Sequence, residues 1–182
     1  ASRDRGSGFS NSTRGIVGNG LNSSSAEVNI IEYVTIASTG NATDFGDSTD
    51  ARSFCACCQS TTRGIWGGGP GLNVIDYVTI ASTGNATDFG DLDTEIEQFG
   101  GLSNSTRGLF GGGSTSGGYV NVIQYITIAS TGNSTDFGDL QASVVQKQGT
   151  ANATRGLFAG GYSGSARINV IDQVEIATTG NA

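Results

Sequence analysis

The residues best suited to chemistry are three closely spaced cysteines, Cys55, Cys57 and Cys58, in the segment SFCACCQ. Thiolates bind metals, but a structural zinc site normally needs four ligands, and the chain contains no histidine. Side chains alternate along a strand, so Cys55 and Cys57 are expected on one face and Cys58 on the other. We predict that the cysteines pack as small buried hydrophobic residues. A disulfide between chains is the second interpretation, because their number is odd, and a metal site is the third.

Pairs of aspartates three residues apart form a second candidate site. They lie in the phrase TDFGD, which occurs three times, and are Asp44, Asp47, Asp88, Asp91, Asp136 and Asp139. Oxygen-rich loops can hold calcium, and two carboxylates can hydrolyse glycosides. The spacing matches no EF-hand or nonapeptide calcium repeat, and an active site is normally unique within a chain. We therefore expect these aspartates to make hydrogen bonds at turns and strand ends, with calcium as the alternative and no other cofactor.

Four arginines share one sequence context, since each follows a threonine and precedes a glycine: Arg14, Arg63, Arg107 and Arg155. A guanidinium forms strong, oriented hydrogen bonds with a carboxylate. We therefore expect these arginines to be structural and to pair with an aspartate of the TDFGD phrase in the same or the next repeat. A ring of arginines that binds an anion is the alternative.

Seven Asn-X-Ser/Thr sequences would accept glycans in a secreted eukaryotic protein. Most of them recur inside the repeated phrases, which favours a role in turns over glycosylation. The asparagines are Asn11, Asn22, Asn41, Asn85, Asn104, Asn133 and Asn152.

The elements that must position these residues come as an internal repeat of roughly 44 to 49 residues, marked by the four arginines. The approximate repeats are 1–47, 48–91, 92–139 and 140–182, within one domain that covers residues 1–182. One such repeat cannot bury enough apolar surface by itself, so we expect a core shared between neighbours.

Each repeat divides into four short strands, which in the second repeat are expected at 51–60, 63–69, 73–82 and 86–92. Glycines interrupt every window of helical length, and only 91–99 is a candidate for a helical turn. Four antiparallel strands in a repeat of this length predict an all-β fold of four propeller-like blades. A β-solenoid is the alternative.

The fourth repeat stops at TGNA without a TDFGD phrase, so its blade is expected to lack the outer strand. An unpaired strand edge invites pairing with another chain. We predict an assembly edge in 168–177, unless the parent chain continues with the missing strand. The apolar residues of this edge are Ile168, Val170, Ile171, Val174 and Ile176.

Composition excludes several classes of function. The net charge of −7 disfavours binding to a phosphate backbone, and no apolar run is long enough to span a membrane. The absence of histidine removes the commonest general base, so an enzyme is not expected. The absence of methionine suggests a processed product or a piece of a longer chain.

The phrases RGIWGGG, NVIDYVTIASTGNATDFGD and RGLFGGG resemble the kelch-like repeats of tail-fibre and other virion proteins in tailed phages, notably those of cyanobacteria. The resemblance covers nearly the whole chain. It implies a β-propeller-like architecture, a structural or attachment role on a virus particle, and no catalytic residues.

We therefore expect a non-enzymatic structural repeat protein of a virion appendage or an extracellular fibre, which associates with itself or with other subunits. The alternative is an adhesin that binds a cell-surface glycan through the variable loops. Tyr119, Tyr162 and Trp66 would then be its stacking platforms. Trp66 occupies a repeated apolar position, held elsewhere by Val17, Phe110 and Phe158, so we expect it in the core.

Overall fold

The structure, a computed structural model, describes residues 2–182 and consists of strands joined by turns and loops. These residues contain no helix, and therefore none long and apolar enough to cross a bilayer. The expected all-β class is confirmed. The helical turn considered for 91–99 does not form, because this segment runs in bends and pairs through Glu97 with Ser114.

The strands form one main antiparallel sheet for each repeat. The first sheet contains β1 (Ser7–Ser10), β2 (Arg14–Gly18), β3 (Val28–Thr35) and β4 (Thr43–Arg52). The second contains β5 (Ala56–Gln59), β6 (Arg63–Gly69), β7 (Leu72–Thr79) and β8 (Thr87–Asp91). The third contains β9 (Gly100–Ser103), β10 (Arg107–Gly111), β13 (Val122–Thr127) and β14 (Thr135–Asp139).

The fourth sheet has three strands, β15 (Gln148–Ala151), β16 (Arg155–Ala159) and β17 (Ile171–Glu175). The expected lack of an outer strand in this repeat is confirmed, and β17 is an edge strand. The spacer of the third repeat carries a small hairpin of its own, β11 (Ser114–Thr115) and β12 (Gly118–Tyr119).

A bulge explains the FG pair of the TDFGD phrase. In the second sheet Ile75 pairs with Gly90 and Asp76 pairs with Asp88, so Phe89 is an extra residue in the outer strand. Gly90 has a φ of 141°, which favours glycine. The bulge bends the strand, and Phe89 is buried in the core at 2% exposure. The same register shift recurs in the first and third sheets.

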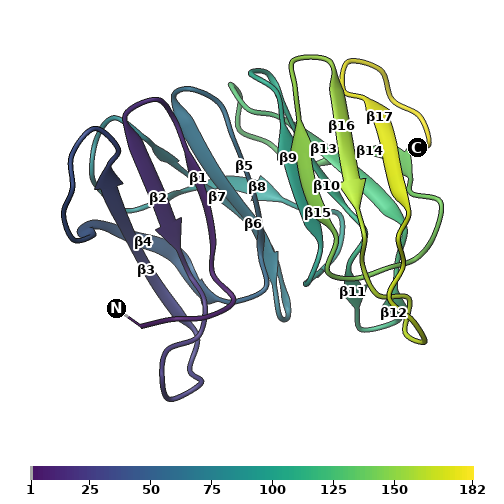
Figure 1. Cartoon of the computed structure of the whole chain (residues 1–182), viewed down its shortest axis with the longest axis horizontal. Coiled ribbons are helices and arrows are strands. Elements are labelled where there is room, and N and C mark those ends of the chain that lie inside the picture. Colours follow the sequence, from purple (N-terminus) through teal and green to yellow (C-terminus); the bar gives the residue numbers. More distant parts are fainter. Residues whose placement is uncertain (1) are drawn as a thin grey trace.

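The sheets stand side by side in chain order, from the first at the left of Figure 1 to the fourth at the right. Their apolar core lies between them in three separate clusters. Each cluster combines one face of a sheet with the opposite face of the next sheet along the chain. We call the side of a sheet that faces the following repeat its front face, and the side that faces the preceding repeat its rear face.

Alternation along the third strand of a repeat supplies both faces, as expected from a period of two. In β7, Ile75 belongs to the front face and packs toward the third sheet. Val78, in the same strand, belongs to the rear face and packs with Trp66 and Phe9 toward the first sheet. The repeated strand therefore serves two interfaces at once.

Candidate functional site

The repeated arginines join each sheet to the next one. Arg14 Nη1 donates to the carbonyl oxygen of Ile80 at 2.7 Å, in the following repeat. Arg63 makes the same bond to Ile128 and Arg107 makes it to Ile176, both at 2.9 Å. These three guanidinium groups also lie over a tyrosine ring of their own sheet, 4.5 to 4.6 Å from its centroid. The tyrosines are Tyr33, Tyr77 and Tyr125.

The expected pairing of these arginines with TDFGD aspartates is wrong. Among residues 2–182, Arg14, Arg63 and Arg107 form no ion pair with an aspartate. Each of these arginines begins the second strand of its sheet and meets the residue that directly follows the third strand of the next sheet, so the acceptor is a backbone carbonyl oxygen. Arg155 has no following repeat within the chain, and its Nε pairs with Glu175 at 3.0 Å instead.

The closing TGN turn docks on the outer strand of the preceding repeat. The amide of Gly84 donates to the carbonyl oxygen of Phe45, and the amide of Ala86 donates to that of Asp47, both at 2.7 Å. Asn85 Oδ1 accepts from the amide of Asp47 at 3.1 Å. The same set recurs at Gly132 to Ser134 and at Gly180 to Ala182. The turn therefore extends the ladder of the neighbouring sheet.

The glycine that follows Arg63, Arg107 or Arg155 leaves a slot that the preceding repeat fills. A Cβ atom at Gly64 would overlap the ring of Phe9, and one at Gly108 would overlap the thiol of Cys58. A Cβ atom at Gly156 would lie 2.8 Å from the side chain of Leu102. In the Arg-Gly pair, the arginine thus donates a hydrogen bond to the next repeat, and the glycine leaves room for a side chain of the previous repeat.

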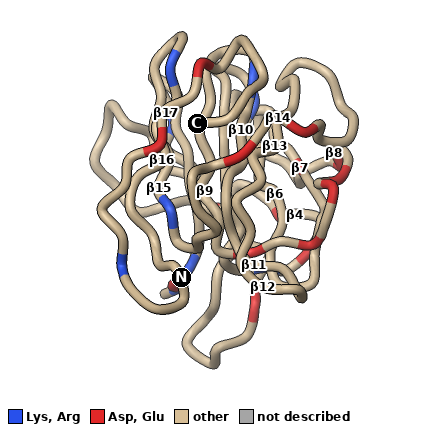
Figure 2. Tube along the Cα trace, turned by 90° about the vertical axis from the view of Figure 1, so that its right-hand side faces the viewer, with Lys and Arg blue, Asp and Glu red and all other residues tan. Residues whose placement is uncertain are grey.

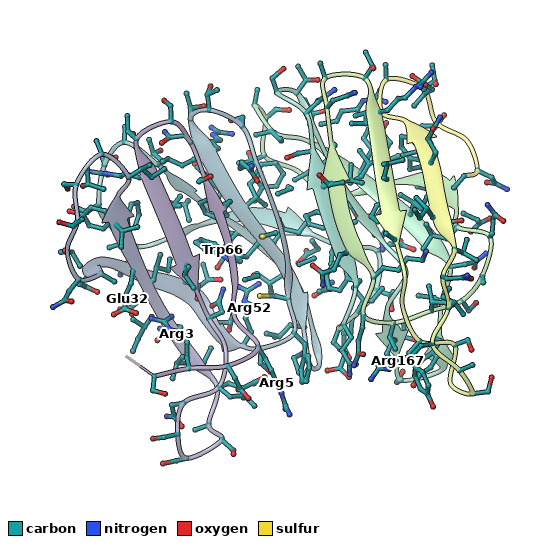
Figure 3. All side chains as sticks on the ribbon, in the orientation of Figure 1. Arg3, Arg5, Glu32, Arg52, Trp66 and Arg167 are labelled. Atoms are coloured by element: carbon teal, nitrogen blue, oxygen red, sulfur yellow. The ribbon has the colours of Figure 1, made fainter. Side chains whose placement is uncertain are left out.

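A polar side chain occupies one position of the third strand in every repeat, and sequence reasoning missed its role. Glu32 pairs with Arg3, Asp76 pairs with Arg52 at 2.8 Å, and Asp172 pairs with Lys147 at 2.5 Å. The equivalent residue of the third repeat is Gln124, which has no cation but hydrogen-bonds Ser134 and the amide of Asp93. Figure 3 shows Arg3, Glu32 and Arg52 in the first half of the array.

The buried pairs are structural cross-links to the third strand from residues that precede the inner strand, since Arg52 is the last residue of β4 and Lys147 directly precedes β15. Arg52 and Asp76 are fully buried, and Thr49 adds two donors to the Asp76 carboxylate. Burial raises the pKa of Asp76, and the charge of Arg52 opposes this shift. The sequence signal that would have found the position is a Glu, Asp or Gln directly after NII or NVI in each third strand.

The TDFGD aspartates lie in the outer strands β4, β8 and β14, where the fourth strand of each repeat was expected. In β8 and β14 they stand at or next to the strand ends, as expected, and none of the six lies in a turn. The backbone carbonyl oxygens of Asp47, Asp91 and Asp139 accept hydrogen bonds from the amides that end the TGN turns of the next repeat. Figure 2 shows acidic residues along the side of the array that carries β8 and β14. Within residues 2–182, no cluster of three or more cysteine, aspartate or glutamate side chains is arranged to hold a metal ion.

The cysteines lie on two faces of β5 and its approach, as predicted. Cys55 and Cys57 pack toward the first sheet, and Cys58 packs toward the third. Cys55 and Cys58 are buried, whereas Cys57 is half-buried and donates to the carbonyl oxygen of Gly8 at 3.1 Å. All three thiols are free. Burial raises their pKa values, that of Cys57 to about 12, so they are poor nucleophiles at neutral pH.

Most of the asparagines in the glycosylation sequences make turn bonds. The Oδ1 atoms of Asn11, Asn104 and Asn152 accept from the amides two and three residues ahead, which starts the turn before three of the four repeated arginines. Asn22 makes a similar turn in the first spacer. Asn85 and its equivalent Asn133 serve the contact between repeats, as described above. Asn41, in the first repeat, is exposed.

The aromatic residues considered for stacking on sugars do not form one surface. Trp66 is fully buried, as predicted, and its Nε1 donates to the carbonyl oxygen of Ser7 (Figure 3). Tyr119 is 38% exposed and packs against Tyr162, with their ring centroids 6.5 Å apart. Val17 is 48% exposed, although the same position is buried in the other repeats.

The expected assembly edge is only partly accessible. Val174 and Ile176 are buried against the third sheet at 3% and 0% exposure, so these side chains cannot reach another chain. Ile168 is half-buried against the same cluster, and Val170 is also half-buried. Ile171, on the front face, is 62% exposed.

A groove of about 510 Å³ follows the inner strands β5, β9 and β15 and the segment around Gly8. Its lining includes the small or neutral side chains of Ser7, Gln59, Ser103 and Thr150. Lys147 also borders it, but its ammonium group is turned to Asp172. These groups can hydrogen-bond a neutral polar molecule, and they include no general base.

The arginine bond, the glycine slot and the TGN turn thus give the repeated residues a common role. These residues form the interface between successive repeats. No protein-family model matches the chain, and no curated protein is significantly similar to it.

Proposed function

We propose that the chain is a non-enzymatic structural repeat protein, a scaffold of four propeller-like blades in a virion appendage or an extracellular fibre. Its blades would assemble with other subunits through their faces and through the open edge of the fourth sheet. The β-solenoid is the less favoured architecture, because each repeat has its own antiparallel sheet.

One observation carries this proposal: the same contact is built three times from the same residue types. The hydrogen bonds of the arginines and of the TGN turns recur between successive sheets at 2.7 to 3.1 Å. The glycine slot also recurs, filled by a different side chain at each junction. Residues that catalyse a reaction are needed once in a chain, whereas residues that join repeats are needed at every junction.

The chemistry of the buried groups also supports a scaffold. The ion pairs of Asp76 and Asp172 are enclosed, and the raised pKa values of the thiols disfavour nucleophilic attack. The adhesin is the alternative. Burial of Trp66 removes one of its three stacking platforms, and the hydroxyl of Tyr162 is bonded to the carbonyl oxygen of Gly164.

A glycan array with the purified chain separates the two functions. The scaffold predicts no reproducible binding, together with ordered particles or fibres when the native assembly is imaged by electron microscopy. Reproducible binding that is lost in a Tyr119→Ala variant, with Tyr33→Ala as a matched tyrosine control, would replace the scaffold by the adhesin. Tyr33 is suited to this control because it belongs to the repeated arginine contact and not to a variable loop.

A further inference from the structure

The rear face of the first sheet has the features that every other rear face uses, but no sheet within residues 2–182 packs against it. Val17, Val34 and Ile36 are 48%, 39% and 54% exposed. Their equivalents in the second sheet are buried at 0% to 3% exposure by the preceding repeat. These equivalents are Trp66, Val78 and Ile80.

Two further features of this rear face match contacts between the other repeats: a slot beside a glycine and a backbone carbonyl group. The slot at Gly15 corresponds to those that Phe9, Cys58 and Leu102 fill in later repeats, and here only Val34 of the same sheet lies near. It belongs to a shallow, mainly apolar hollow of about 580 Å³. The carbonyl oxygen of Ile36 corresponds to the acceptors of the three arginines, and no described residue donates to it.

The front face of the fourth sheet offers the complementary groups. Leu157 and Ile171 hold the positions at which Ile65 and Ile75 are buried in the second sheet. Leu157 is half-buried and Ile171 is 62% exposed. Arg155 stands where the other arginines reach forward, and its side chain is 60% exposed. Four of the five large hydrophobic residues that are exposed within residues 2–182 therefore lie on these two end faces.

We propose that a second copy of this chain docks its fourth sheet on the first sheet, head to tail, in the manner of the contacts between repeats. Arg155 donates to the carbonyl oxygen of Ile36, Thr150 enters the slot at Gly15, and the two apolar faces cover each other. Such a contact is heterologous, so it closes into a ring or continues as a filament. The inference rests on the proposed scaffold function and names the contact through which the scaffold grows.

The front face of the fourth sheet differs from the other front faces in two residues and in its missing outer strand, and these differences weaken the contact. Thr150 replaces Phe9, Cys58 or Leu102, and Gln173 replaces the tyrosine under the arginine. The fourth sheet has no outer strand, so the turn at 39–41 lies outside the contact. The docking is therefore weaker than the junctions inside the chain, and it depends on protein concentration.

Sedimentation velocity over a wide range of concentrations tests the docking with the full chain and two variants. Val34→Asp blocks the rear face and Ile171→Asp blocks the front face, both at exposed positions, with folding checked by circular dichroism. We expect the wild type to self-associate and each variant to remain monomeric. An equimolar mixture of the two variants should form a complex of two chains and nothing larger, because each retains one functional face.

A gain-of-function variant keeps the test decisive if the wild-type contact is weak. Thr150→Leu combined with Gln173→Tyr restores the residues of the other repeats and should tighten association at least about tenfold. The gain should vanish when Val34→Asp is added. The proposal is overturned if neither the wild type nor this variant associates, or if association survives Ile171→Asp. Glycan binding tests the scaffold function separately, so the two failures are distinguishable.

Discussion

The fourth repeat contains a buried ion pair between Lys147 and Asp172. Both side chains are 1% exposed, and Lys147 Nζ also lies near the carbonyl oxygen of Phe158. An ion pair in such surroundings contributes little net stability, because desolvation offsets the attraction. Removing one partner is costly, since it leaves the other charge buried without compensation. The third repeat avoids the pair, with Gln124 at the same position.

Lys147→Met should therefore lower the free energy of unfolding by about 3 to 5 kcal/mol, measured by urea denaturation. The double variant Lys147→Met/Asp172→Leu should recover most of this loss, because neither charge remains. A single variant that costs less than about 1 kcal/mol would show that the carboxylate gains solvent or a proton without penalty. A double variant as unstable as the single one would show that packing, and not charge, determines the cost.

The glycine of the TDFGD bulge is required for a second reason besides its backbone conformation. A Cβ atom at Gly90 would lie 2.5 Å from the backbone of Gly132 in the next repeat, and its φ is 141°. Gly90→Ala should destabilise the chain by about 2 to 5 kcal/mol through strain and overlap. Gly40→Ala is the matched control, because nothing lies within 4 Å of a Cβ there. Equal unfolding midpoints for the two variants in urea would contradict this account.

At the scale of the element, an arginine links two strands of its own sheet to the next sheet. The guanidinium of Arg63 covers the ring of Tyr77 and donates to the carbonyl oxygen of Ile128. Arg63→Met retains the aliphatic stem but loses both interactions, and should cost about 1 to 3 kcal/mol. Arg155→Met should change stability by less than about 1 kcal/mol, since the Arg155 pair is exposed. Thermal unfolding of both variants measures the difference, and a similar loss in each would refute the role of the carbonyl bond.

The strands themselves were predictable because their information is local. The β-branched run at β7 alternates between two faces, and the glycines around it exclude a helix. Trp66 was therefore correctly expected in the core, and Cys58 was correctly expected on the face opposite Cys55 and Cys57. The absent outer strand of the fourth repeat followed from the missing TDFGD phrase.

The partners of polar groups were not predictable, because they depend on how one sheet lies against another. Charge alone suggested aspartates for Arg63, whereas the nearest acceptor is a carbonyl oxygen of the next repeat. The pairing of Lys147 with Asp172 joins residues 25 positions apart in segments that differ between repeats. Repetition also misleads at Val17, which is exposed because no other sheet within residues 2–182 packs against the rear face of the first sheet.

At the scale of the whole molecule, the core is divided. Its three clusters lie at the three junctions between sheets, and each sheet takes part only in the junctions with its neighbours. Stability in such an array is close to a sum of repeat and junction contributions. A loss at one junction should therefore remain local, and the first and fourth sheets should respond independently.

Hydrogen exchange read by mass spectrometry tests this division with two matched truncations of fully enclosed residues. Leu109→Ala removes apolar contacts at the third junction and should cost about 2 to 5 kcal/mol, with faster exchange in the third and fourth sheets. Ile16→Ala does the same at the first junction and should accelerate exchange in the first and second sheets. Each variant should leave the distant end of the array protected, because no cluster connects the two ends. Uniform acceleration across all four sheets in either variant would instead show one cooperative unit, in which the repeated contacts transmit every local loss to the whole chain.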